Sequence, residues 1–147
     1  MKSKVYVIEG SPNNWCEAIK DTSSVFLANG DVMDSFYDSC VAREMEFPTG
    51  LNTLLPVAIP HTNADSVINT GVCLMRTTKP VTFSRMEDKE QKVEVNFVLN
   101  LAINSAGAQL KALQQVIRLF QNEEFKEKSM NMSLDELKEL FTNNWDI

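Results

Sequence analysis

The sequence predicts a single α/β domain in which helices flank a mixed β-sheet, an arrangement known as an α/β sandwich. Runs of β-branched residues with a period of two indicate strands, and apolar residues at spacings of three and four indicate amphipathic helices. Helices are expected first, most strands follow, and further helices end the chain. No repeat and no Pro/Gly/Ser-rich linker divides the 147 residues. A chain of this length forms one core, so we expect residues 1–147 to be one domain.

The first fifty residues predict one strand and two helices. VYVIE at 5–9 is a short β-branched run, which is typical of a strand. From 13 to 28 the apolar residues lie on one helical face, and an Asn-Gly pair follows as a stop signal. Asp31 is expected to cap a second helix, which Pro48 ends. That helix is expected to carry Met33, Phe36, Tyr37, Cys40, Val41 and Glu44.

Three further strands are expected at 57–59, 70–77 and 92–103. The last of them first alternates and then becomes almost continuously apolar, as a central strand buried on both faces does. The Asn-Ser pair at 104–105 can cap the long amphipathic helix that comes next. The Ser-Leu-Asp-Glu segment at 133–136 is a capping box, which predicts a short terminal helix.

Composition argues against several classes of protein. The net charge of −6 is opposite to the clustered positive charge that nucleic-acid binding needs, so we expect no nucleic-acid partner. The three cysteines are widely spaced without a CxxC, which argues against a disulfide framework or a zinc knuckle. The N-terminus lacks the apolar stretch of a signal peptide, and no run reaches the roughly 20 apolar residues of a membrane span. We therefore expect a cytoplasmic protein.

The only histidine of the chain, His61, lies in the segment PVAIPHT at 56–62. Pro60 lacks an amide hydrogen, so strand pairing is expected to stop there and His61 to project from a rigid corner. Ligand chemistry in α/β proteins gathers at such strand ends. The alternatives are a metal ligand, which lacks a second histidine or a carboxylate pair beside it, a serine-type triad, which lacks a GxSxG, and a structural histidine.

A second candidate is Arg43, near the end of the second expected helix and just before the segment FPTG at 47–50. It follows Cys40 by three positions, so we expect it to border the apolar face rather than the solvent face. An arginine in that position must be paired or lie in a cleft.

Taken together, these segments resemble the IIA component of the sugar phosphotransferase system. The residues that carry the resemblance are ARExxFPTGL from Ala42, VAIPHT from Val57, PVTFSRM from Pro80 and the AQLKALQQV helix from Ala108. The similarity is to the fructose/mannitol IIA superfamily, most of all to its galactitol-type branch, and it extends over nearly the whole chain.

The resemblance implies a phosphohistidine carrier that accepts a phosphoryl group from the histidine of HPr and passes it to a cysteine of a IIB component. The family's phosphorylated histidine corresponds to His61 and its active-site arginine to Arg43. We expect Nε2 to attack while Nδ1 is held by a backbone carbonyl. The membrane IIC component is an indirect partner only, and no direct contact with sugar is expected.

Three further residues are binding candidates. Thr49 and Thr62 could donate hydroxyl hydrogen bonds to the phosphoryl oxygens. Mannitol-type members carry a second histidine at the start of the long C-terminal helix, and the nearest match here is Gln109. A glutamine can donate a hydrogen bond but cannot take up a proton near neutral pH. We expect neither a metal ion nor a cofactor.

Two other functions are compatible with the same residues. One is a IIA-like regulatory domain, in which phosphorylation of the histidine is a signal rather than a relay step. The other is a binding module in which His61 is inert. The transported sugar cannot be read from this chain, since a IIA component contacts proteins rather than sugar.

Overall fold

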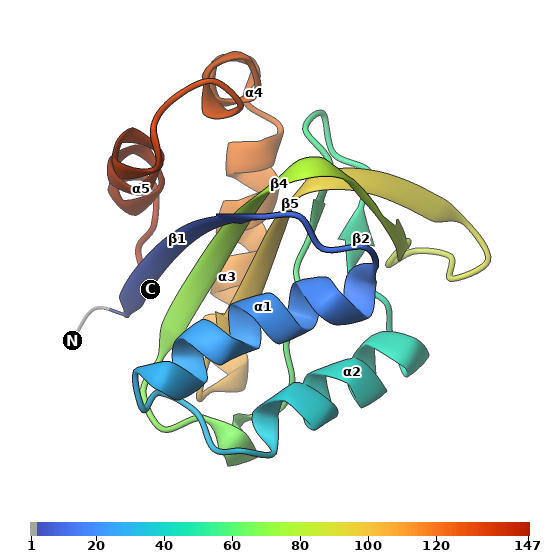
Figure 1. Cartoon of the computed structure of the whole chain (residues 1–147), viewed down its shortest axis with the longest axis vertical. Coiled ribbons are helices and arrows are strands. Elements are labelled where there is room, and N and C mark those ends of the chain that lie inside the picture. Colours follow the sequence, from blue (N-terminus) through green and yellow to red (C-terminus); the bar gives the residue numbers. More distant parts are fainter. Residues whose placement is uncertain (1–2) are drawn as a thin grey trace.

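A five-stranded mixed sheet forms the centre of the protein, with helices on both of its faces (Figure 1). The computed structural model describes residues 3–147. The strands are β1 (Lys4–Gly10), β2 (Gly50–Leu51), β3 (Val57–Ala58), β4 (Gly71–Ser84) and β5 (Lys92–Ala102). The helices are α1 (Trp15–Ala28), α2 (Phe36–Glu46), α3 (Ala106–Phe120), α4 (Glu123–Ser129) and α5 (Leu134–Asn143), with a short 3-10 turn η1 (Ala64–Ser66). The predicted α/β sandwich with a mixed sheet is confirmed.

The order of the strands across the sheet is β1-β4-β5-β3-β2. β1 pairs with β4 and β3 pairs with β5 in parallel, whereas β4 pairs with β5 and β2 pairs with β3 in antiparallel fashion. β5 therefore lies in the middle of the sheet, as its continuous apolar sequence predicts, and the residues from Phe97 to Ala102 are all buried.

Two hydrophobic layers follow from the alternation of side chains along the central strands. In β4, Leu74 packs into the layer under α3 and α5, while the next residue, Met75, packs into the layer under α1. The side chains of β5 alternate in the same way: Leu99 packs into the layer under α3 and α5, and Val98 packs into the layer under α1. Figure 1 shows α1 and α2 on one face of the sheet and α3 on the other.

Most of the predicted helices and strands are confirmed. Two of the three predicted helix caps are confirmed as well, and one is wrong. Ser105 rather than its neighbour caps α3, and Ser133 forms the predicted capping box of α5. The prediction that Asp31 caps the second helix is wrong, because α2 begins only at Phe36. Asp31 is instead fully buried and binds Lys4 at 2.8 Å, since a buried carboxylate needs a positive partner more than a cap position does.

Three short elements were not predicted: η1, α4 and β2. α4 has only seven residues, too few for a helical period to be visible in the sequence. β2 consists of two residues inside a segment that resembles a turn, and it forms because Gly50 lies against the end of β4. A Cβ atom at Gly50 would come within 2.6 Å of the carbonyl oxygen of Ser84 and within 2.7 Å of Val93.

Substitution of Gly50 by alanine should therefore destabilise the protein by about 1–3 kcal/mol, the usual range for overpacking. The free energy of unfolding in urea measures this change. Gly107 is a matched control, because nothing lies within 4 Å of the position of its missing Cβ in α3. Gly107→Ala should be neutral or stabilising by up to about 1 kcal/mol, and equal destabilisation by the two substitutions would contradict the close contact at Gly50.

Candidate functional site

His61 lies three residues after the end of β3 and remains in register with β5. The pairs Val57 with Phe97 and Ala58 with Val98 continue as a parallel bridge between His61 and Leu101. The carbonyl oxygen of Pro60 accepts a hydrogen bond from the amide of Leu101 at 3.0 Å. Pairing is thus interrupted by the proline but not ended, contrary to the sequence prediction, because proline loses only its donor and keeps its acceptor.

The imidazole of His61 is held by a single hydrogen bond within the described residues. Its Nδ1 atom lies 2.7 Å from the carbonyl oxygen of Ile59. A carbonyl oxygen can only accept, so Nδ1 carries the proton and Nε2 presents its lone pair. Because Ile59 precedes proline, this carbonyl belongs to a rigid segment, and the ring is oriented with little freedom.

The electrostatics of the site favour a neutral imidazole. Burial lowers the pKa of His61 below its ordinary value of 6.5, and the positive charge of Arg43 acts in the same direction. The hydrogen bond to the Ile59 carbonyl opposes them in part, because it favours the protonated ring. At neutral pH the Nε2 lone pair is therefore available for nucleophilic attack.

A pocket of about 470 Å³ contains His61 and three of the other predicted site residues. Arg43, Thr49 and Gln109 line it together with His61. Thr62 does not line this pocket and is almost completely buried. The first turn of α3 also borders the pocket, through Ala106 and Gln109. The positive end of that helix dipole favours an anion at this place.

Arg43 is exposed on α2 rather than at the edge of its buried face, so the sequence prediction of its environment is wrong. The buried position is the next one, Glu44, which continues the stripe that includes Phe36 and Cys40. Arg43 forms no ion pair within residues 3–147, and its guanidinium carbon lies 5.4 Å from the centroid of the Phe47 ring. Its five donors remain free for a phosphoryl group.

The two threonines and the glutamine have other partners in this structure. The hydroxyl group of Thr49 donates to Glu44 at 2.8 Å, which uses its only proton. The carbonyl oxygen of Thr62 accepts from Nε2 of Gln109 at 3.0 Å. Gln109 thus ties the start of α3 to the histidine segment, and its amide hydrogens are directed at backbone carbonyls, with Ile103 as a second, longer contact at 3.4 Å.

Glu44 is a buried residue beside the site that was not among the predicted site residues. Its two carboxylate oxygens accept hydrogen bonds from Thr49, one from the backbone amide at 2.7 Å and one from the hydroxyl. Burial raises the pKa of Glu44 to about 7, although the Thr49 hydrogen bonds and the charge of Arg43 act against this. The available signal was its spacing of four from Cys40 and eight from Phe36, which placed a carboxylate on a buried face.

The loop that follows β4 also lines the histidine pocket, through Met86, Glu87, Asp88 and Lys89. All four of these residues are exposed, as is typical of a charged run in a loop. Lys89 adds a second positive charge to that of Arg43, and Glu87 and Asp88 add negative charges. The pocket is therefore of mixed charge rather than strongly basic.

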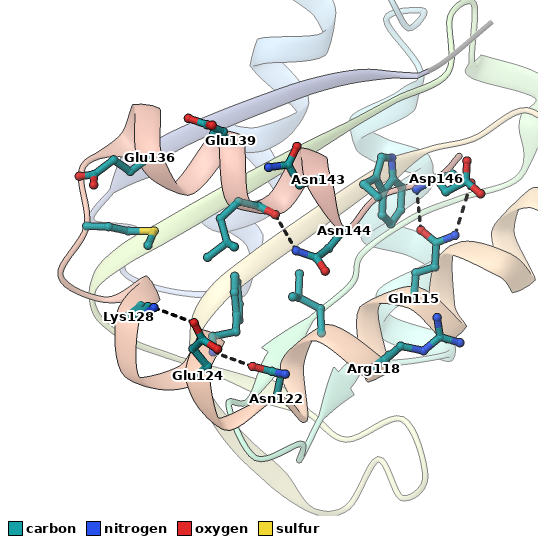
Figure 2. A pocket seen from close by; sticks show the side chains of 15 residues that line it. Gln115, Arg118, Asn122, Glu124, Lys128, Glu136, Glu139, Asn143, Asn144 and Asp146 are labelled. Carbon is teal, nitrogen blue, oxygen red and sulfur yellow. Dashed lines mark hydrogen bonds and ion pairs between the residues drawn. The ribbon is translucent and has the colours of Figure 1, made fainter.

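A larger pocket of about 800 Å³ lies elsewhere, between α3, α4 and α5 (Figure 2). Its polar groups bind one another: Lys128 contacts Glu124 at 2.6 Å, and Gln115 accepts from the amide of Asp146 at 2.8 Å. It contains neither histidine nor cysteine. The imidazole of His61 lies in the smaller pocket, which is therefore the candidate site. Across residues 3–147 no three metal-binding side chains are grouped, and no helix is long and apolar enough to cross a membrane.

Glu44→Gln should change how stability depends on pH. The carboxyl pKa rises from 4.5 in the unfolded chain to about 7 in the native protein, so the native state binds more protons between these values. The stabilisation that comes from the raised pKa of Glu44 is therefore fully present below pH 4.5 and is lost as the pH rises to about 7. Relative to Glu44→Gln, the wild-type protein should lose on the order of 3 kcal/mol across this window.

Urea unfolding of both proteins at several pH values measures the free energy of unfolding of each. Subtracting the value for Glu44→Gln from that of the wild type removes the contribution of His61, which both proteins share. That contribution has the opposite sign, because a lowered histidine pKa makes stability rise with pH up to about 6.5. Asp38→Asn, an exposed change on the same helix, is the control and should show no such trend. A pH-independent difference between wild type and Glu44→Gln would show that the Glu44 pKa is not shifted.

Comparison with known proteins identifies the family. Residues 2–144 match the family described as "Phosphoenolpyruvate-dependent sugar phosphotransferase system, EIIA 2". The galactitol-specific EIIA component of the phosphotransferase system of Escherichia coli K12 is 32% identical over 127 residues, covering 86% of this chain and 84% of that protein. The same identity and coverage are found for its counterpart in E. coli O157:H7.

Solved structures show the same fold. Enzyme IIAMTL of Escherichia coli, in its complex with phosphorylated enzyme IIBMTL, superposes with a TM-score of 0.76 at 21% identity, covering 95% of this chain and 94% of that one. Nitrogen regulatory protein IIA-Ntr of Neisseria meningitidis gives a TM-score of 0.72 at 20% identity, with 95% and 93% covered. The fold and the family match agree: the chain belongs to the EIIA 2 family of the phosphoenolpyruvate-dependent sugar phosphotransferase system.

Proposed function

We propose that the protein carries a phosphoryl group on Nε2 of His61, accepting it from HPr and passing it to the cysteine of a IIB component during sugar uptake. The observation that carries this proposal is the hydrogen bond from Nδ1 to the Ile59 carbonyl, which leaves Nε2 as the one free ring nitrogen. The pocket beside it contains Arg43, which forms no ion pair within residues 3–147.

The transfer itself needs little covalent help from the protein. The Nε2 lone pair forms a bond to phosphorus as the bond from phosphorus to the donor's histidine nitrogen breaks, and the bonding pair leaves with the donor's ring. Positive charge then develops on the imidazole of His61, while Nδ1 keeps its proton. The Ile59 carbonyl stabilises this charge, and the Arg43 fork stabilises the equatorial oxygens of the phosphoryl group.

Partner proteins must bring their own reacting groups to Nε2, so the rim of the pocket is the expected contact surface. Part of this rim is apolar and exposed: Phe47 and Leu110 are 56% and 59% accessible and both line the pocket. Exposed apolar side chains around a reactive group are typical of a protein-binding surface. Among the relatives, a structure of IIAMTL with phosphorylated IIBMTL exists, which supports a IIB component as one partner.

A regulatory role is the second candidate, because the fold is shared with nitrogen regulatory protein IIA-Ntr. The identity with the galactitol-specific transport components is higher, at 32% against 20%, and this favours the relay. Transfer of phosphate from the phosphorylated protein to a IIB cysteine is expected of a relay and separates the two roles.

His61→Ala should abolish phosphorylation. Wild-type protein incubated with phosphoenolpyruvate, Enzyme I and HPr should gain the mass of one phosphoryl group, which acid should remove because phosphohistidine is acid-labile. Intact mass spectrometry before and after acid treatment measures this. Full phosphorylation of His61→Ala would overturn the assignment of the site.

Arg43→Gln should slow phosphoryl transfer by about a hundredfold, the usual effect of losing one transition-state donor. The melting temperature should hardly change, since Arg43 is exposed and has no ion pair. The pKa of His61 should rise in this variant, because the Arg43 charge lowers it in the wild type. Arg43→Lys should recover only part of the rate, as an ammonium lacks the bidentate fork.

Rapid-quench kinetics measure the rate, and NMR titration of the ring measures the pKa. Arg118→Gln is the control, because Arg118 is equally exposed but lies on α3 in the other pocket. It should transfer phosphate at the wild-type rate. If Arg43→Gln unfolds while its folded fraction reacts normally, Arg43 is structural.

A further inference from the structure

Glu44 differs from the other buried charged side chains in residues 3–147 because it has no ion pair. Asp31 binds Lys4, and Arg76 binds Glu9, each at 2.8 Å. Glu44, which is only 6% exposed, is bound by Thr49 alone. Burial of an unpaired carboxylate is costly, and the position is on an apolar stripe where a leucine or methionine would fit the helix equally well. The fold alone therefore does not account for a glutamate there.

The carboxylate begins a continuous series of hydrogen bonds that ends at His61. The Thr49 hydroxyl donates to Glu44 at 2.8 Å and accepts from the amide of Ile59 at 3.2 Å. The same amide also lies 3.3 Å from the carbonyl oxygen of Thr49. Ile59 in turn offers its own carbonyl oxygen to Nδ1 of His61 at 2.7 Å.

We infer that Glu44 is a positioning residue for phosphoryl transfer, acting on His61 through Thr49 and Ile59. The kinetic part of this inference rests on the proposed function of His61, whereas the hydrogen-bond series is independent of it. Glu44 never touches the phosphoryl group. Its task is to fix the carbonyl that holds the imidazole.

The chemistry of the carboxylate sets the direction of the series. In its ionised form, which predominates above the pKa of about 7, the Glu44 carboxylate only accepts, so the Thr49 hydroxyl then points its proton at Glu44 and its lone pairs at Ile59. This anchors Ile59 from the amide side, while Pro60 stiffens it from the carbonyl side. A carbonyl held in this way keeps Nδ1 protonated and aims Nε2 into the pocket. A misplacement of about 1 Å in a reacting group can cost a hundredfold in rate.

A purely structural role would predict something different. In that case Glu44 would only fasten the FPTG turn to α2, and its loss would lower stability without changing the ring of His61 in the molecules that remain folded. The two roles therefore separate on measurements made on folded protein.

Three variants and one control test the inference. Glu44→Gln keeps the shape but cannot accept from both Thr49 donors. Thr49→Val removes the hydroxyl, and Thr49→Ser retains it. Cys40→Ala is the stability control, because Cys40 is fully buried on the same helix, one turn before Glu44, and lies outside the hydrogen-bond series.

The first measurement is the NMR spectrum of the His61 ring, which needs no phosphorylation. Wild type, Thr49→Ser and Cys40→Ala should show a single Nδ1–H tautomer with a slowly exchanging ring proton. Glu44→Gln and Thr49→Val should show faster exchange of that proton and a mixture of tautomers. The second measurement is the rate of phosphorylation by HPr at saturating donor.

In that assay Glu44→Gln and Thr49→Val should lose on the order of tenfold to a hundredfold in rate, with the KM for HPr unchanged. Thr49→Ser should recover most of the rate, and Cys40→Ala should keep it. The double variant should be no slower than the slower single one, since both act on one series. Unchanged tautomer and rate in Glu44→Gln and Thr49→Val would overturn the inference. Failure of wild-type protein to be phosphorylated would overturn the proposed function instead. The NMR result would still show whether Glu44 and Thr49 hold the His61 ring in place through Ile59.

Discussion

The hydrogen bond between Nδ1 of His61 and the carbonyl of Ile59 is the interaction on which the chemistry of this site depends. It decides which ring nitrogen carries the proton and so which one can act as a nucleophile. Both atoms belong to a three-residue segment, Ile59-Pro60-His61, which Pro60 stiffens but does not by itself place against the sheet. The register of β3 on β5 holds one side of it, since the same offset continues from Val57 to His61 across the proline.

The other side of the segment is held by residues of α2 and the FPTG turn. Gly50 can approach the backbone of Ser84 because it has no side chain, and this contact places Thr49 above Ile59. The buried carboxylate of Glu44 then fixes Thr49 with two hydrogen bonds. Strand β2 and Glu44 of α2 thus lie next to Thr49, whose hydroxyl contacts the amide of Ile59.

Most of the fold could be predicted from the sequence, because periodicity and caps report directly on long elements such as β5 and α3. That His61 and Arg43 are candidate site residues could also be predicted, because one is the only imidazole and follows a strand and the other is a cation just before a turn. The sequence could not show that Asp31 is buried against Lys4, because that pair joins positions 27 residues apart. The spacing of Glu44 from Phe36 and Cys40 does place it on the buried face, and the environment of Arg43 was wrongly predicted because one position of helical rotation, about 100°, separates a buried side chain from an exposed one.

The mixed charge of the pocket fits a group that must be passed on. A site that held phosphate with several unopposed cations would stabilise the phosphorylated state and slow its release to the next protein. Here Arg43 and Lys89 share the rim with Glu46, Glu87 and Asp88, so the field on an incoming dianion is moderate. The lowered pKa of His61 acts in the same sense, because a weakly basic nitrogen is a better leaving group than an ordinary imidazole. If His61 carries the phosphoryl group as proposed, burial serves both halves of the relay: it keeps Nε2 unprotonated for attack, and it makes the bond to phosphorus easier to break.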